Sequence, residues 1–175
     1  MNEFIVAYYV VIAASSALLA RETKARIVTL PLGWKGLKFA PITIVILMVY
    51  AIFVYPYLDA IPLMNWGWLR YNIALGPFGD QGFLGILPFI PILIYMLLHL
   101  NYYEEVYFRR NKKLVVLWAF LHIAMGVQLH VVLALLPVGF IYKYIYDRHG
   151  INNAYSAHFA TNIFMVFSML VAYAL

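Results

Sequence analysis

The chain has 175 residues, of which 66% are hydrophobic and only 11% are charged, and its mean hydropathy is +0.86. Soluble globular proteins are about 45–50% apolar and about 25% charged, because their surface must dissolve in water. The composition therefore excludes a soluble domain and predicts a protein dissolved in lipid. At about 20 apolar residues per crossing, the chain has room for at most about six or seven helices. We expect them to form a single membrane domain over residues 1–175.

Charge and cysteine content narrow the possible chemistry. The formal net charge is +5 and the chain has no cysteine, which excludes disulfides, thiolate nucleophiles and cysteine-ligated metals. In a soluble protein, such positive charge could indicate a nucleic-acid partner. In a membrane protein it more often lies at the cytoplasmic ends of helices. We therefore expect membrane lipids, and no nucleic acid, among the partners.

The first part of the chain predicts two membrane crossings joined by a basic loop. Residues 4–20 carry no charge. No basic region or cleavage site marks them as a signal peptide, so we expect a retained helix. Residues 21–38 hold five Lys or Arg and one Glu, so the positive-inside rule places this loop in the cytoplasm. The second crossing is expected over residues 37–58.

A long loop and a kinked helix follow. Residues 59–82 are rich in Gly and Pro, which predicts an irregular connection on the outer side of the membrane. The third crossing begins near residue 83 and is bent by Pro88 and Pro91, because proline removes a backbone donor inside a helix. No helix-breaking residue follows in the sequence up to residue 110, so this helix is expected to continue to the next basic cluster.

The last third of the chain predicts three helices, one of them incomplete. Only 33 residues, 114–146, separate basic flanks that we place on the same side, whereas two crossings and a turn need about 40. We therefore predict a short helix over 112–125 and a return helix that ends near Tyr146. A turn over 147–150 then leads to a last helix that starts near Asn152. The expected fold is an all-α, polytopic bundle of about six membrane helices with both termini outside.

Acidic side chains inside the predicted helices are candidate functional groups, because membrane segments exclude charge. Glu104 and Glu105 point about 100° apart on a helix, and Glu105 has the i,i+4 spacing of a favourable ion pair with Arg109. Glu104 has no basic residue three or four positions later. An unpaired carboxylate among apolar neighbours can serve as a general base or acid. A solvated helix end with loosely exchanging charges would explain the same residues.

Three further polar residues lie at a similar depth in the predicted helices. His122 is about 15 Å beyond the basic start of its helix. His158 and Asn162 share one helix face, because they are four residues apart. Two such groups can donate hydrogen bonds to one oxyanion, or they can bond between helices, and His122 can be a packing residue. Because their depths coincide with that of Glu104, we expect the four to meet in the cytoplasmic half of the bundle.

The motifs resemble those of the CPBP (Abi) family of intramembrane glutamic endopeptidases, which includes the CAAX-processing proteases. The family pattern is EExxxR, then an aromatic residue four positions before a histidine, then HxxxN. Here these motifs read EEVYFR over 104–109, WAFLH over 118–122 and HFATN over 158–162. The resemblance covers residues 101–164 as a motif core, while the N-terminal helices of residues 1–100 match nothing in particular.

The resemblance implies a peptidase that cleaves a membrane-associated peptide or protein without a cofactor or a metal. Glu104 would activate the attacking water with help from His122. His158 and Asn162 would hold the tetrahedral oxyanion. The resemblance also implies three supporting residues: Glu105, Arg109 and Trp118.

Two other classes of function stay open. A catalytically inactive member could be a scaffold or a subunit of a larger membrane complex, and a small transporter or lipid-binding protein could use the same groups as a proton relay. His99 and His130 match no motif, and we interpret both as packing or interface residues. In each case we expect an integral, multi-pass protein of the cell membrane whose motif face lies towards the cytoplasm.

Overall fold

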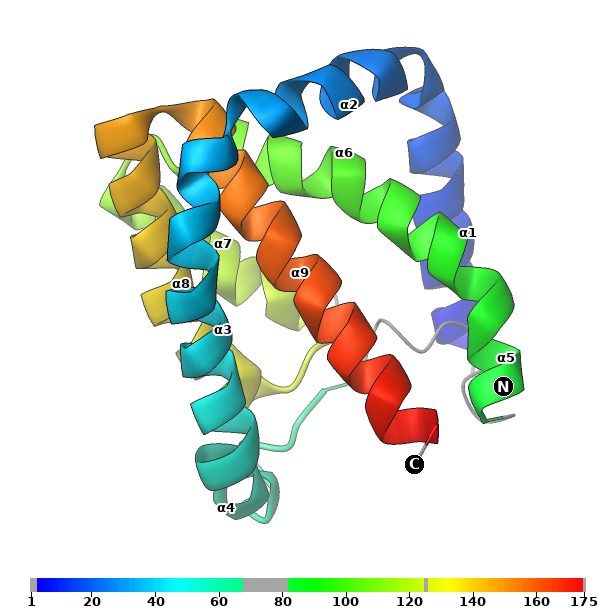
Figure 1. Ribbon diagram of the computed structural model, residues 1–175. Coiled ribbons are helices and arrows are strands. Elements are labelled where there is room, and N and C mark those ends of the chain that lie inside the picture. The colour runs from blue at the N-terminus through cyan, green and yellow to red at the C-terminus, as the bar shows by residue number, and fades with distance from the viewer. Residues whose placement is uncertain (1–2, 68–81, 125, 175) are drawn as a thin grey trace.

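The computed structural model describes residues 3–67, 82–124 and 126–174, which contain helices and no strand. The predicted all-α class is therefore confirmed. Figure 1 shows the long helices running side by side, with α2 lying across one end of the bundle. The α-helices are α1 (Glu3–Leu18), α2 (Thr23–Leu32), α3 (Ala40–Val49), α4 (Tyr55–Asp59), α5 (Phe83–Ile86), α6 (Ile90–Phe108), α7 (Lys112–Ala124), α8 (Leu129–His149) and α9 (Ile151–Ala174). The 3₁₀ turns are η1 (Ala20–Glu22), η2 (Trp34–Phe39) and η6 (Leu87–Phe89), and η3 (Tyr50–Val54) is a π-helical turn.

Among the residues that the structure describes, four helical stretches are long and apolar enough to cross a membrane. This finding confirms the membrane class of the protein. The helix α7 has 13 residues and rises only about 20 Å at 1.5 Å per residue, less than the roughly 30 Å of a bilayer core. It is thus the short helix predicted over 112–125. The four stretches are Trp34–Asp59, Phe83–Phe108, Leu129–His149 and Ile151–Ala172.

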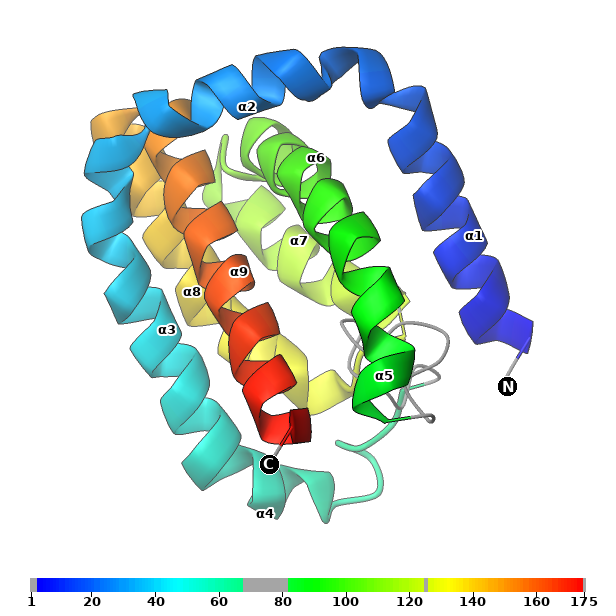
Figure 2. The same cartoon turned by 45° about the vertical axis from the view of Figure 1, so that its right-hand side comes forward.

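Residues 21–38, predicted as a loop, are helical instead. They form η1, α2 and η2, and α2 crosses the end of the bundle in contact with α6 and α9 (Figures 1 and 2). The prediction was wrong because it took the many charged residues of this stretch as the sign of an irregular loop exposed to water. On α2, Arg26 turns towards α6, whereas Lys24 and Val28 are exposed. A helix that lies at the surface of the bundle can hold Arg26 against α6 and still leave Lys24 and Val28 exposed.

Two glycines allow the chain to turn from α2 into α3 against the start of α9. A Cβ atom on Gly33 would lie 1.9 Å from the carbonyl oxygen of Asn152, and one on Gly36 would lie 2.0 Å from that of Asn153. Any larger residue would therefore push η2 away from α9. The same corner places α3 beside α9, where Thr43 Oγ1 and Thr161 Oγ1 are 2.6 Å apart.

The turn between the last two helices is shorter than predicted. The helix α8 continues to His149, and only Gly150, with φ of 82°, separates it from α9. Glycine adopts this left-handed conformation without the steric cost that other residues pay. Residues 147–149, predicted as part of the turn, are helical because one glycine is enough to reverse the chain here.

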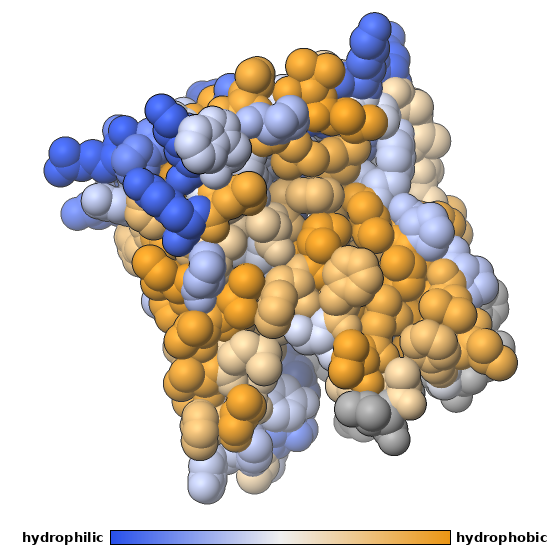
Figure 3. Space-filling view, in the orientation of Figure 1, coloured by the Kyte–Doolittle hydropathy of each residue, from blue (hydrophilic) through white to orange (hydrophobic). Residues whose placement is uncertain are grey.

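The surface agrees with a lipid environment. Figure 3 shows hydrophobic side chains covering the flanks of the helices, with the most hydrophilic residues of this face gathered near the α2 end. The buried core consists of separate hydrophobic clusters, each formed where helices meet. One cluster joins α1, α5, α6 and α9 through residues that include Tyr9, Ile86, Leu93 and Val166. A second joins α8 and α9, and a third joins α7 and α8.

Candidate functional site

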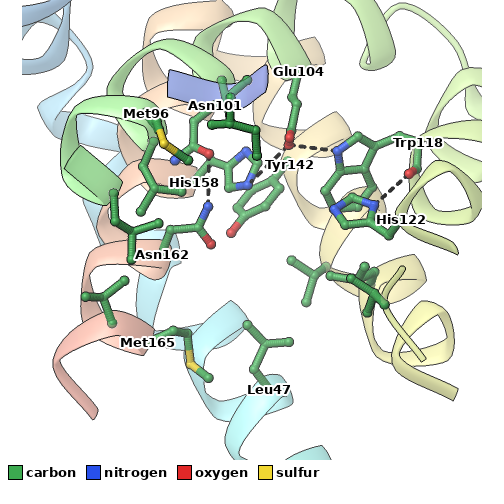
Figure 4. A pocket seen from close by; sticks show the side chains of 18 residues that line it. Leu47, Met96, Asn101, Glu104, Trp118, His122, Tyr142, His158, Asn162 and Met165 are labelled. Atoms are coloured by element: carbon green, nitrogen blue, oxygen red, sulfur yellow. Dashed lines mark hydrogen bonds and ion pairs between the residues drawn. The ribbon is translucent and has the colours of Figure 1, made fainter. Parts of the chain in front are cut away.

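A cavity of about 210 Å³ lies between the helices, and all four residues predicted to be catalytic line it. Figure 4 shows their side chains converging from α6, α7 and α9, with Tyr142 added from α8. The rest of the wall is mainly apolar and includes Leu47, Met96 and Met165. The polar residues on the wall are Asn101, Glu104, Trp118, His122, Tyr142, His158 and Asn162.

The carboxylate of Glu104 contacts side chains from two other helices. The indole Nε1–H of Trp118 donates a hydrogen bond to Glu104 Oε2 over 2.7 Å, and His158 Nε2 lies 3.7 Å from the same oxygen. The expectation of an unpaired carboxylate was therefore wrong. It considered only residues on the same helix, whereas both partners come from α7 and α9. The side chain keeps 22% of its surface exposed, so it can still meet a water molecule.

Glu105 and Arg109 form the ion pair that their spacing predicts. Arg109 Nε lies 3.1 Å from Glu105 Oε1, and both side chains have no exposed surface. The same carboxylate oxygen accepts a hydrogen bond from His158 Nδ1 at 2.8 Å. This bond fixes the orientation of the imidazole ring and directs Nε2 towards Glu104.

His122 reaches the site through Trp118. Its Nδ1–H donates to the backbone carbonyl of Trp118 over 2.8 Å, and the two rings meet edge to face with centroids 4.9 Å apart. Since the carbonyl can only accept, the proton lies on Nδ1 and Nε2 is left as the second functional nitrogen. Among the contacts of the described residues, Trp118 joins His122 to Glu104, and Figure 4 shows the indole beside both.

Two polar residues on the cavity wall were not predicted. Asn101, one turn before Glu104 on α6, accepts a hydrogen bond from Asn162 Nδ2 at 2.9 Å. Its spacing of three residues from Glu104 was a usable signal, because such residues share a helix face. Tyr142 stacks on His158 with ring centroids 4.4 Å apart and an interplanar angle of 24°. No pattern within α8 alone predicts a role for Tyr142, because its contact with His158 depends on how α8 packs against α9.

Aromatic rings also cover the buried guanidinium group. Arg109 Cζ lies 4.1 Å from the centroid of the Trp118 ring and 5.6 Å from that of Tyr142. A cation over an aromatic face is attracted by the negative face of the ring, and the attraction grows when water is excluded. Arg109 therefore links the Glu105 carboxylate to the two aromatic residues that contact His158.

His99 and His130 are buried and do not line the cavity. His99 Nε2 lies 3.2 Å from Thr23 Oγ1, which joins α6 to α2. His130 Nδ1 hydrogen-bonds with the hydroxyl of Tyr50, and its Nε2 lies 3.6 Å from Asp59. These contacts connect helices in the way expected of packing residues.

The arrangement combines a partly exposed carboxylate, two imidazoles and two amides in a largely apolar cavity. Such a set can hold a water molecule, accept its proton and donate hydrogen bonds to a developing oxyanion. Within the described ranges, no group of three or more His, Asp or Glu is placed to hold a metal ion. Comparisons of the chain with protein-family models, with curated proteins and with solved structures find no match.

Proposed function

We propose that the chain is an intramembrane endopeptidase of the CPBP type, in which Glu104 activates water to attack a peptide bond. The observation that carries this proposal is the meeting of the motif residues at one cavity, with Glu104 Oε2 only 3.7 Å from His158 Nε2. A general base acts on a water molecule within its hydrogen-bond reach, and the groups that hold the oxyanion must lie near the same water. The closeness of Glu104 and His158, which are 54 positions apart in the chain, supports such a site.

The proposed reaction needs only the chain's own groups and water. Trp118 and His158 contact Glu104 Oε2, so Oε1 is the oxygen that takes the proton of the attacking water. The resulting hydroxide adds to the carbonyl carbon. The oxyanion then accepts hydrogen bonds from Asn162 Nδ2 and from His158 when Nε2 is protonated. Glu104 finally passes its proton to the amide nitrogen as the carbon–nitrogen bond breaks.

The membrane arrangement belongs to the same proposal. We place α1 and the incomplete helix α7 in the bilayer beside the four spanning stretches, which makes six membrane helices. The α2 end is assigned to the cytoplasm, because exposed basic residues gather there and positive charge is retained on that side. The protein is then a multi-pass protein of the cell membrane with its site in the cytoplasmic half. These exposed basic residues include Arg21, Lys24, Lys35 and Lys38.

A comparison in the native host tests the proposed activity. Strains carry the wild type, Glu104→Gln or the control Asp147→Asn, an exposed acid on α8. We expect one or more membrane proteins to accumulate uncleaved in the Glu104→Gln strain only, since glutamine keeps the size of the side chain but cannot accept the proton. Equal amounts of the variants in the membrane fraction are the control for folding. Identical processing in all three strains would rule the proposal out.

One observation favours a second candidate function, a non-catalytic scaffold or subunit of a larger membrane complex. Asn162 Nδ2 already donates to Asn101, and both ring nitrogens of His158 face carboxylates. The proposed oxyanion donors are therefore engaged inside the protein. A scaffold would co-purify with its complex in fixed stoichiometry, and the Glu104→Gln variant would co-purify equally well without a change in processing.

A further inference from the structure

The indole of Trp118 occupies a central place beside the proposed general base. Its side chain is buried, with 3% of its surface exposed. The Nε1–H bond points to Glu104 Oε2 at 2.7 Å, and the ring face receives the guanidinium of Arg109 at 4.1 Å. Figure 4 shows the indole nitrogen directed towards the Glu104 carboxylate. The residue thus has one contact that any aromatic ring could make and one that requires an indole.

The roles of donor and acceptor are fixed in this hydrogen bond. Indole nitrogen is a donor only, so it cannot exchange roles with the carboxylate. A hydrogen bond from a neutral N–H to an ionised oxygen is stronger than one between neutral groups. It is also held in a cavity with largely apolar walls, where such bonds are strengthened by the low local dielectric constant. Glu104 Oε2 is therefore occupied, and rotation of the carboxylate about its terminal bond is restrained.

We propose that Trp118 is a positioning residue that orients the Glu104 carboxylate so that Oε1 faces the water to be activated. This inference rests on the proposed function of Glu104. Phenylalanine at this position would keep the ring over Arg109 but would lose the donor. The loss would leave the carboxylate free to rotate and to turn the wrong oxygen towards water. Because phenylalanine keeps an aromatic ring on the same part of the cavity wall, we expect substrate binding to be unchanged.

The hydrogen bond is tested without any substrate. The purified full chain is labelled with ¹⁵N at the indole nitrogens in detergent micelles, where its four tryptophans give at most four indole signals. Trp118→Phe identifies the signal of Trp118, and Trp34→Phe, at an exposed position on η2, removes a control signal. We expect the Trp118 proton to lie downfield of the others and to move upfield in Glu104→Leu, which has no acceptor. A Trp118 signal that is unchanged in Glu104→Leu overturns the inference.

The positioning role is tested by cleavage of the membrane protein that accumulates in the Glu104→Gln strain. For Trp118→Phe we expect kcat to fall about 10- to 100-fold, the loss of one hydrogen bond to a charged group, with KM unchanged. Trp34→Phe is expected to cleave like the wild type. A Trp118→Phe enzyme with wild-type kcat, or with a changed KM and the same kcat, overturns the positioning role. Failure of the proposed function itself is seen separately, as normal processing in the Glu104→Gln strain.

Discussion

His158 Nδ1 donates a hydrogen bond to Glu105 Oε1 at 2.8 Å across a sequence separation of 53 residues. This bond joins α9 to α6 at the level of the cavity. Because Glu105 also pairs with Arg109, the imidazole is attached to a buried ion pair rather than to a mobile side chain. The second carboxylate of the motif therefore has a role distinct from the first: it fixes His158, while Glu104 faces the cavity.

Breaking the buried ion pair should strongly destabilise the protein. In Arg109→Met, Glu105 keeps a buried charge without its main partner, and we expect a loss of about 3–5 kcal/mol in the free energy of unfolding. The measurement is reversible unfolding of the purified protein in detergent. Lys143→Met is the matched control, because it breaks the exposed pair with Asp147, which should cost less than about 1 kcal/mol. Equal losses in the two variants would contradict the prediction.

The corner between α2 and α3 should not accept a side chain. Gly33→Ala places a Cβ atom 1.9 Å from the Asn152 carbonyl oxygen, so η2 or the start of α9 must move. We expect a destabilisation of about 1–3 kcal/mol, the usual cost of overpacking, measured as a lower midpoint of thermal unfolding. Ala25→Leu adds volume on the exposed side of α2 and should leave the midpoint close to that of the wild type. A Gly33→Ala variant as stable as the wild type would show that this contact is looser than described.

Tyr142 should act on His158 through its ring. Tyr142→Phe keeps the stacked ring and is expected to behave like the wild type in unfolding and in cleavage. Tyr142→Leu removes the aromatic pair, which contributes about 0.5–1.5 kcal/mol beyond the burial of the side chain, and it releases one face of the His158 imidazole. We expect lower stability and slower cleavage in Tyr142→Leu only. If the phenylalanine variant is as impaired as the leucine variant, the hydroxyl rather than the ring is responsible.

Stability at acid pH should depend on Glu22, which lies in η1 outside the four spanning stretches. The hydroxyl of Tyr103, which donates to the carboxylate at 2.6 Å, and then Arg26 hold the pKa of Glu22 below its ordinary value of 4.5. Folding therefore favours the ionised form. Its contribution to stability is present above the unfolded-state pKa and is lost as the pH falls through the lower, folded-state pKa.

The measurement is the thermal midpoint of wild type and Glu22→Gln as a function of pH. We expect the difference between them to be largest near neutral pH and to shrink as the pH falls below the ordinary value of 4.5. Tyr103→Phe removes the larger of the two causes and should show part of the same change. A constant difference between wild type and Glu22→Gln at every pH would refute the linkage.

Patterns within single helices were sufficient to predict part of the site. The four-residue spacing of Glu105 and Arg109 predicted their ion pair, and that of His158 and Asn162 placed both on the face of α9 that lines the cavity. Such spacings are reliable because the geometry of an α-helix determines which side chains are neighbours. The same local reasoning missed Asn101, although its three-residue spacing places it on the helix face of Glu104.

Other features depended on contacts between segments. Residues 21–38 formed a helix across the bundle because Arg26 contacts rings on α6 and Gly33 packs on α9, and neither partner is close in the chain. The hydrogen bond from Trp118 to Glu104 likewise joins two helices. A single-helix pattern cannot predict such a bond, because it does not contain the rotation of one helix relative to the other.

By itself, the sequence determined that this protein lies in lipid, that its fold is helical, and which charged residues form pairs within a helix. Hydropathy and helical spacing are properties of short segments, and lipid requires every spanning segment to satisfy its backbone hydrogen bonds internally. Only the tertiary structure decided that Glu104 lies against Trp118 and His158, and that Tyr142 stacks on the same imidazole. Those contacts depend on how the side chains of neighbouring helices pack, which sets the distance and rotation between helices.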